Sequence, residues 1–155
     1  MPIPEFVAEL RQLVGTRELW LPGVTAVVRR GDQVLLVRRA DNGRWAPVTG
    51  LVDPREHPAV AARREVLEET GVEATVDRLA WTGVVGPVTY DNGDVASYLD
   101  VTFACTYVGG TAHVADDESV EVGWFDLSDL PEMPTDMLQR VAAATSGEER
   151  AQFSR

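Results

Sequence analysis

Three glutamates stand at helical spacing near the middle of the chain. Glu68 and Glu69 lie three and four positions after Glu65, so on a helix the three carboxylates share one face within a turn. Such like charges repel one another, and a helix C-terminus nearby disfavours anions further. A hard cation removes this repulsion, because Mg²⁺ and Mn²⁺ bind carboxylate oxygens together with substrate phosphates. Taken alone, the spacing is more typical of a solvated helix face paired with Arg63 or Arg64.

The wider pattern removes this ambiguity. Gly50 is followed after five residues by Glu56, and after seven more by Arg64 and the glutamate cluster, which ends at Gly71 and Val72. Seven residue types at set offsets have a chance probability on the order of 10⁻⁸ per start position. The segment matches the Nudix box at every defining position, so the chain resembles Nudix hydrolases. The flanking segments that extend the resemblance, over roughly residues 23–144, are Val34–Arg39, Trp45–Pro47 and Glu121–Pro131.

The resemblance implies roles for the box residues. Glu65 would act on the attacking water or bridge metal ions, and Arg64 would orient the neighbouring carboxylates. Glu68 and Glu69 would be metal ligands, with Glu69 counted among the catalytic residues as well. Glu56 would support the helix through Arg64 and is a candidate ligand of a second metal. The expected cofactor is Mg²⁺, with Mn²⁺ as an alternative.

Two further metal ligands are implied outside the helix. In many relatives a glutamate from the loop before the last strand joins the metal site. Here Glu118 is favoured by its offset from Trp124, with Asp117 and Glu121 left open. Thr49 stands where most members have glycine, and its backbone carbonyl would bind the metal. The substitution raises the question of whether this position needs φ > 0, which glycine adopts easily and threonine does not.

Substrate contacts are expected from residues around the box. Arg39 and Arg44 are candidates for neutralising phosphate charge, and Trp45 and Tyr90 are candidates for stacking on a base. For each of them a surface or packing role is the alternative. His57 and His113 are interpreted as surface histidines, because nothing in the sequence pairs them for acid–base work.

The box indicates hydrolysis of a pyrophosphate linkage in a nucleoside diphosphate derivative. The first choice of substrate is a nucleoside triphosphate, with oxidised guanine nucleotides included, because the short chain resembles small pyrophosphatases of that kind. Pro87 lies 15 residues past Val72, a spacing that resembles ADP-ribose hydrolases. Tyr90 lies 18 residues past Val72, near the place of a tyrosine in dinucleoside polyphosphate hydrolases, which it resembles. A non-catalytic nucleotide sensor is disfavoured by the complete box. A prenyl diphosphate isomerase is disfavoured by the position of Cys105 in a predicted strand.

The elements that must position these residues follow from periodicity and turn signals. An amphipathic helix is predicted over residues 3–14, a hairpin over 24–28 and 34–37, and the box helix from Pro58 to Thr70. Further strands are predicted over 74–85, 96–108 and 120–125, then a helix over 137–144 and a frayed tail over 145–155. This order indicates one mixed α/β (α+β) domain over 1–155, for which the resemblance implies a mixed β-sheet sandwiched between helices.

The charge composition limits the classes of molecule that this chain is expected to bind. The 155 residues carry 14 basic and 25 acidic side chains and a net charge of −11, which disfavours duplex DNA and anionic membranes. No basic leader or long apolar run is visible, and Cys105 is the single cysteine, so a cytoplasmic location is expected. The expected partner is a small nucleotide, and a homodimer is left open.

Overall fold

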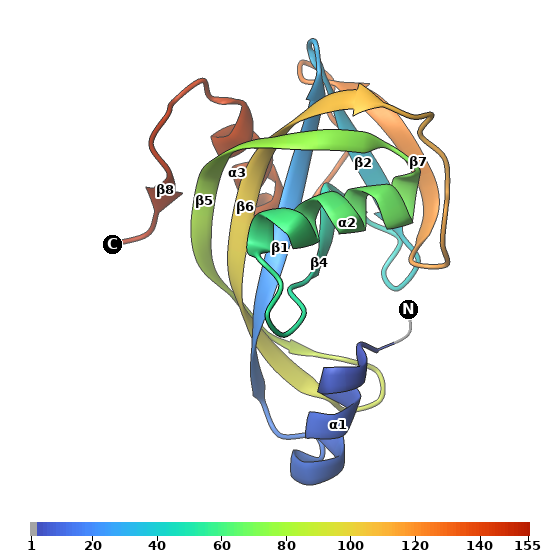
Figure 1. The fold of residues 1–155 in the computed structure, drawn as a ribbon, viewed down its shortest axis with the longest axis vertical. Coiled ribbons are helices and arrows are strands. Elements are labelled where there is room, and N and C mark those ends of the chain that lie inside the picture. The colour runs from blue at the N-terminus through green and yellow to red at the C-terminus, as the bar shows by residue number, and fades with distance from the viewer. Residues whose placement is uncertain (1–2) are drawn as a thin grey trace.

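The computed structural model describes residues 3–155 and contains a mixed β-sheet with helices on both faces (Figure 1). The main path of the sheet is β3-β2-β1-β6-β5-β8, while β4 pairs with β1 and β7 pairs with β2. The strands are β1 (Leu19–Arg30), β2 (Gln33–Arg39), β3 (Trp45–Ala46), β4 (Val48–Leu51), β5 (Glu73–Thr89), β6 (Val95–Gly109), β7 (Ser119–Asp126) and β8 (Gln152–Phe153). The helices are α1 (Glu5–Val14), α2 (Pro58–Thr70) and α3 (Thr135–Thr145).

The two sides of β1 build two separate cores. Val24, Ala26 and Val28 lie in the core under α2, whereas Val27 lies in the core that contains Val141 of α3. This alternation follows from the two-residue period of a strand, in which successive side chains point to opposite faces. β1 runs parallel to β6 and antiparallel to β2 and β4. The predicted mixed sheet between helices is therefore confirmed.

Helix α2 has the predicted bounds because both its ends carry local signals. Pro58 occupies the first turn, where a missing N–H costs nothing, and Gly71 ends the helix at φ 68°, donating its N–H to Leu67. Val60 and Leu67, although apolar, are about half exposed. The buried face consists of Ala61, Ala62, Glu65, Val66, Glu69 and Thr70. Two glutamates of the box thus lie on the buried side.

Helix α1 packs below the sheet in Figure 1 and is joined to the β5–β6 hairpin. Its Val7 contacts the core formed with Leu21 and Ala96. Arg11 donates Nη2–H to the Val95 carbonyl at 2.7 Å and lies 3.5 Å from Asp94. The helix begins at Glu5, two residues later than predicted, after Pro4 at its N-cap. These contacts hold α1 against the end of the sheet.

The C-terminal segment differs from the frayed tail expected for residues 145–155. Helix α3 extends from Thr135 to Thr145, and β8 then pairs in parallel with β5 at Trp81 and Thr82.

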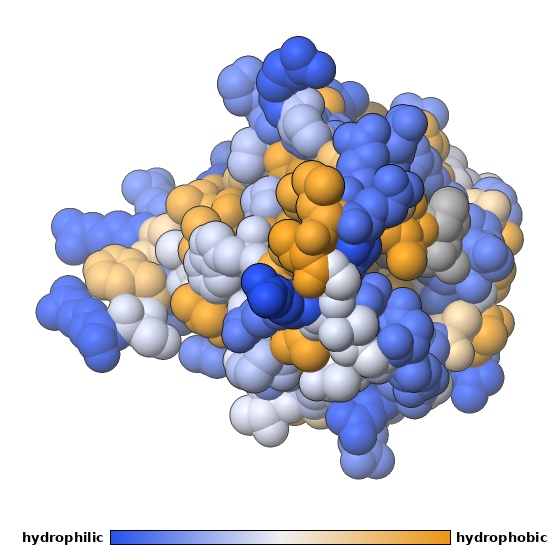
Figure 2. Space-filling view, turned by 90° about the horizontal axis from the view of Figure 1, so that it is seen from below, coloured by the Kyte–Doolittle hydropathy of each residue, from blue (hydrophilic) through white to orange (hydrophobic). Residues whose placement is uncertain are grey.

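Seen from below, hydrophobic residues gather near the centre of the surface among hydrophilic ones (Figure 2). Leu10 and Leu13 are the exposed large apolar residues of α1. No helix within residues 3–155 is long and apolar enough to cross a membrane.

Candidate active site

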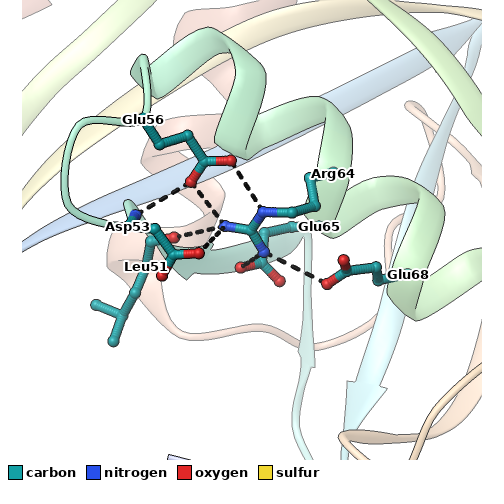
Figure 3. Close-up of polar contacts among 6 residues, drawn as sticks. All are labelled: Leu51, Asp53, Glu56, Arg64, Glu65 and Glu68. Carbon is teal, nitrogen blue, oxygen red and sulfur yellow. Dashed lines mark hydrogen bonds and ion pairs between the residues drawn. The ribbon is translucent and has the colours of Figure 1, made fainter. Parts of the chain in front are cut away.

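Arg64 is the centre of a dense polar network at the start of the site (Figure 3). Its Nε and Nη2 donate to the two carboxylate oxygens of Glu56, both at 2.9 Å, and Nη2 also donates to the Leu51 carbonyl at 3.0 Å. Its Nη1 donates to Glu65 at 2.8 Å and to Glu68 at 3.3 Å. The bond from Arg64 lowers the pKa of Glu56. One guanidinium therefore orients three of the box glutamates, the arrangement expected from the sequence.

Glu65 packs closely against strand β4, because Gly50 has no side chain at the point of contact. A Cβ atom built on Gly50 would lie 2.2 Å from Cδ of Glu65 and 2.3 Å from its Oε1. Glu65 is only 7% exposed, and burial raises the pKa of its carboxyl group. A glycine at position 50 thus has a steric reason, since the strand and the helix approach closely at this pair.

Glu69 and Glu118 form the most strongly perturbed part of the site. Burial, followed by the charges of Glu118 and Glu65, raises the pKa of Glu69 to about 9. Burial and the charge of Asp116 raise the pKa of Glu118 to about 7. Arg39 opposes both shifts only weakly. Buried carboxylates that repel one another in this way hold protons at neutral pH unless a cation replaces them.

The loop that carries Glu118 is fastened to the end of α2 by its backbone. His113 donates its backbone N–H to the Thr70 carbonyl at 3.0 Å, and Ala115 donates to the Glu69 carbonyl at 3.1 Å. The Glu118 carbonyl in turn accepts from Ala40 at 2.8 Å. These bonds use helix carbonyls that would otherwise lack partners. They bring a glutamate nearly fifty residues away in sequence beside the box.

The donor chemistry of the site fits a hard divalent cation. Glu65, Glu69 and Glu118 interact electrostatically, and carboxylate oxygens are the ligands that Mg²⁺ and Mn²⁺ prefer. Within residues 3–155 no three Asp, Glu, His or Cys side chains already form a group that could hold an ion. Arg64 accounts for part of this, because it holds Glu65 and Glu68 on its own donors.

A cleft of about 530 Å³ opens beside this network, between α1 and the turn that precedes α2. Its apolar lining comes from Pro4, Phe6, Leu51 and Pro54. Its charged lining consists of six carboxylates and two guanidinium groups: Glu5, Glu9, Asp53, Glu65, Glu68 and Glu118, with Arg55 and Arg64. The cleft therefore suits a ligand that brings its own cation.

Thr49 lies in β4, where Arg39 donates to its hydroxyl at 3.0 Å. Among the described residues Arg55 is the single non-glycine with positive φ, so Thr49 does not adopt the backbone conformation that would favour glycine. Arg39 also pairs with Asp41 at 2.7 Å. Glu121, one alternative for the metal site, pairs instead with Arg38 at 2.8 Å.

The four residues expected to contact substrate fall in different surroundings. Arg39 and Tyr90 interact electrostatically, and the Tyr90 hydroxyl is hydrogen-bonded to that of Tyr98. Trp45, in contrast, packs edge-on against Phe125, with ring centroids 4.7 Å apart, in the core under α3. Arg44 is exposed in the turn before β3 and does not line the cleft. Of the four, Arg39 also interacts electrostatically with Glu69 and Glu118.

Several residues that line the cleft were not predicted from the sequence. Glu5 and Glu9 reach the cleft from α1, and Asp53 and Arg55 reach it from the turn before α2. Asp53-Pro54 followed by Glu56 carries a turn signal that indicates a special backbone position at residue 55. Nothing comparable in the sequence indicates that α1 forms a wall of the site.

Comparison with known proteins agrees with this arrangement. The sequence model of the NUDIX domain matches residues 19–144. The chain is 38% identical over 106 residues to a MutT-like protein of Streptomyces ambofaciens, covering 68% of this chain and 63% of that protein. It is 34% identical over 116 residues to the NAD-capped RNA hydrolase NudC of Pasteurella multocida, covering 73% and 41%. The chain thus spans about two fifths to two thirds of the length of these relatives.

Solved structures show the same fold. A NUDIX hydrolase from Nitrosomonas europaea superposes with a TM-score of 0.70 at 25% identity, covering 86% of this chain and 93% of that one. A UDP-X diphosphatase superposes with a TM-score of 0.68 at 22% identity, covering 99% and 75%. At that identity the second likeness concerns the fold alone. Together with the matched domain model, these findings show that the chain belongs to the NUDIX domain family.

Proposed function

We propose that this chain hydrolyses the pyrophosphate linkage of a nucleoside diphosphate derivative in a reaction that depends on a divalent cation. The observation that carries the proposal is the electrostatic interaction among Glu65, Glu69 and Glu118, three carboxylates whose pKa values are raised. Such a cluster is unfavourable until a cation and an anionic substrate complete it. Membership of the NUDIX domain family supports the same reaction class.

The cation supplies Lewis-acid activation of a water molecule and neutralises charge on the substrate phosphates. In the proposed mechanism Glu69 and Glu118 would hold the cation, and Glu65 would accept the proton of the attacking water. Burial makes Glu65 a better base than an exposed glutamate, and Oε2 is the acceptor because Oε1 is bonded to Arg64. Arg64 keeps Glu65 in position through its bonds to Glu56.

A nucleoside triphosphate is the first candidate substrate. The likeness to a MutT-like protein supports it, while the likeness to NAD-capped RNA hydrolases favours a second candidate, a diphosphate that joins two nucleosides or a nucleoside and a sugar. The products separate these classes. A triphosphate yields a nucleoside monophosphate and pyrophosphate, whereas ADP-ribose and dinucleotides yield two monophosphates.

The proposal is tested with a panel of nucleoside triphosphates, NAD, ADP-ribose and dinucleoside polyphosphates, each with Mg²⁺, with Mn²⁺ and with excess chelator. Glu65→Gln is expected to lower kcat by about 10²- to 10⁴-fold without unfolding the protein, because it removes the proton acceptor. Glu73→Gln, at an exposed position on β5, is the matched control and should retain full activity. Undiminished turnover in chelator, or a Glu65→Gln protein within threefold of wild type, contradicts the proposal.

A further inference from the structure

The turn before α2 holds an arginine in a conformation that favours glycine. Glu56 donates its N–H to the Asp53 carbonyl at 2.9 Å, which closes a four-residue turn with Pro54 second and Arg55 third. Arg55 has φ 70°, as the third residue of a type II turn requires. A side chain with a Cβ is strained in this region, and glycine is not. Strain of this kind is retained where the residue serves a purpose.

Arg55 is exposed and lines the acidic cleft, and within residues 3–155 its side chain has no hydrogen bond or ion pair. The other arginine of the cleft cannot replace it. All three nitrogens of the Arg64 guanidinium already donate, to Glu56, Glu65, Glu68 and the Leu51 carbonyl. The chain contains no lysine, so its cationic side chains are arginines and two histidines. Arg55 is thus the uncommitted cation among six carboxylates of the cleft.

We infer that Arg55 is a phosphate-binding residue of this site, contacting the substrate's diphosphate group opposite the metal-binding carboxylates. The inference rests on the proposed function. A guanidinium offers paired N–H donors that match two phosphate oxygens, and an unpaired one reaches the ligand without first breaking an internal bond. The strained turn places Arg55 in the wall of the cleft, whereas a glycine at position 55 would relax the turn and leave the diphosphate without that donor.

Two substitutions at this position separate binding from strain. Arg55→Ala removes the cation but keeps a Cβ at positive φ, whereas Arg55→Gly removes both. Both variants are expected to raise KM about tenfold and to weaken binding of a non-hydrolysable α,β-methylene nucleotide by the same factor, measured by calorimetry. Only Arg55→Gly should also raise the melting temperature. Arg63→Ala, an exposed arginine on α2 outside the cleft, is the matched control and should change none of these values.

Unchanged KM and unchanged analogue binding in Arg55→Ala and Arg55→Gly would overturn the inference, whatever their melting temperatures. Arg55→Lys keeps a cation but not the paired donors, and it should bind with intermediate affinity, which provides a folded comparison if the glycine variant does not fold. The wild-type protein separates this failure from a failure of the proposed function. If it neither hydrolyses nor binds any nucleotide of the panel, the proposed function is wrong. If it does both and the Arg55 variants match it, the inference alone is wrong.

Discussion

Removing the divalent cation should make the stability of this protein fall as the pH rises, and Glu69 sets the size of the effect. In the folded protein the pKa of Glu69 is raised to about 9, chiefly by burial, while an unfolded glutamate titrates near 4.5. Between these values the folded state keeps a proton that the unfolded state has lost. The free energy of unfolding therefore decreases with increasing pH across this window.

The magnitude follows from the shift. One pKa unit corresponds to about 1.4 kcal/mol, so raising the pH from about 5.5 to about 8.5 should lower the free energy of unfolding by roughly 4 kcal/mol. Glu118, with a pKa of about 7, contributes in the same direction over the lower part of the range. A domain of this size is stable by only about 5–15 kcal/mol, so the loss is readily measured.

The assay is urea unfolding in excess chelator at several pH values, compared with Glu69→Gln, which does not titrate. The Gln variant should show a much flatter dependence on pH, whereas Glu73→Gln, an exposed control, should follow the wild type. Mg²⁺ should restore stability most at high pH, because a bound cation stabilises the ionised cluster. An unfolding free energy in chelator that stays constant or increases from pH 5.5 to 8.5 would refute the reasoning.

Three other substitutions test the site and the core of the fold. Gly50→Ala should lower kcat about a hundredfold with little change in melting temperature, because its Cβ displaces the flexible Glu65 carboxyl group; normal activity would contradict this. Arg140→Ala should destabilise the fold by about 3–5 kcal/mol in chemical denaturation, because Arg140 is 2% exposed and lies 3.6 Å from buried Asp100. Tyr90→Ala should raise KM more than it lowers kcat if Tyr90 stacks on the base, and an unchanged KM in steady-state kinetics removes it from the site.

The helix and strand positions were largely predictable because their signals are local. Pro58 and Gly71 bound α2 at the residues expected, and the β-branched runs predicted the hairpin of β1 and β2. The four-residue step from Arg64 to Glu68 favours the bond between them, since such a step brings helix side chains together, whereas no helical spacing accounts for the bond from Arg64 to Glu65. Periodicity did not show how far each strand extends, because pairing with a neighbour lengthens a strand beyond its apolar run.

The surroundings of the candidate substrate-binding residues were less predictable, because they depend on which faces of the fold pack together. Trp45 is near the box in sequence, yet β3 directs it toward Phe125 and the core under α3. Whether an aromatic side chain near a site is core or ligand contact depends on the opposite layer of the fold. One chain's sequence does not contain that information in any local pattern.

The sequence by itself determined the helical register of Glu65, Glu68 and Glu69, and the full spacing from Gly50 to Val72 identified the family. Only the tertiary structure decided which distant groups join them. Backbone bonds from the loop before β7 to the end of α2 bring Glu118 to the cluster, and α1 closes the cleft opposite Arg55. The physical reason is one of range: helix periodicity acts over a single turn, whereas loop docking and helix packing depend on buried surfaces far apart in the chain.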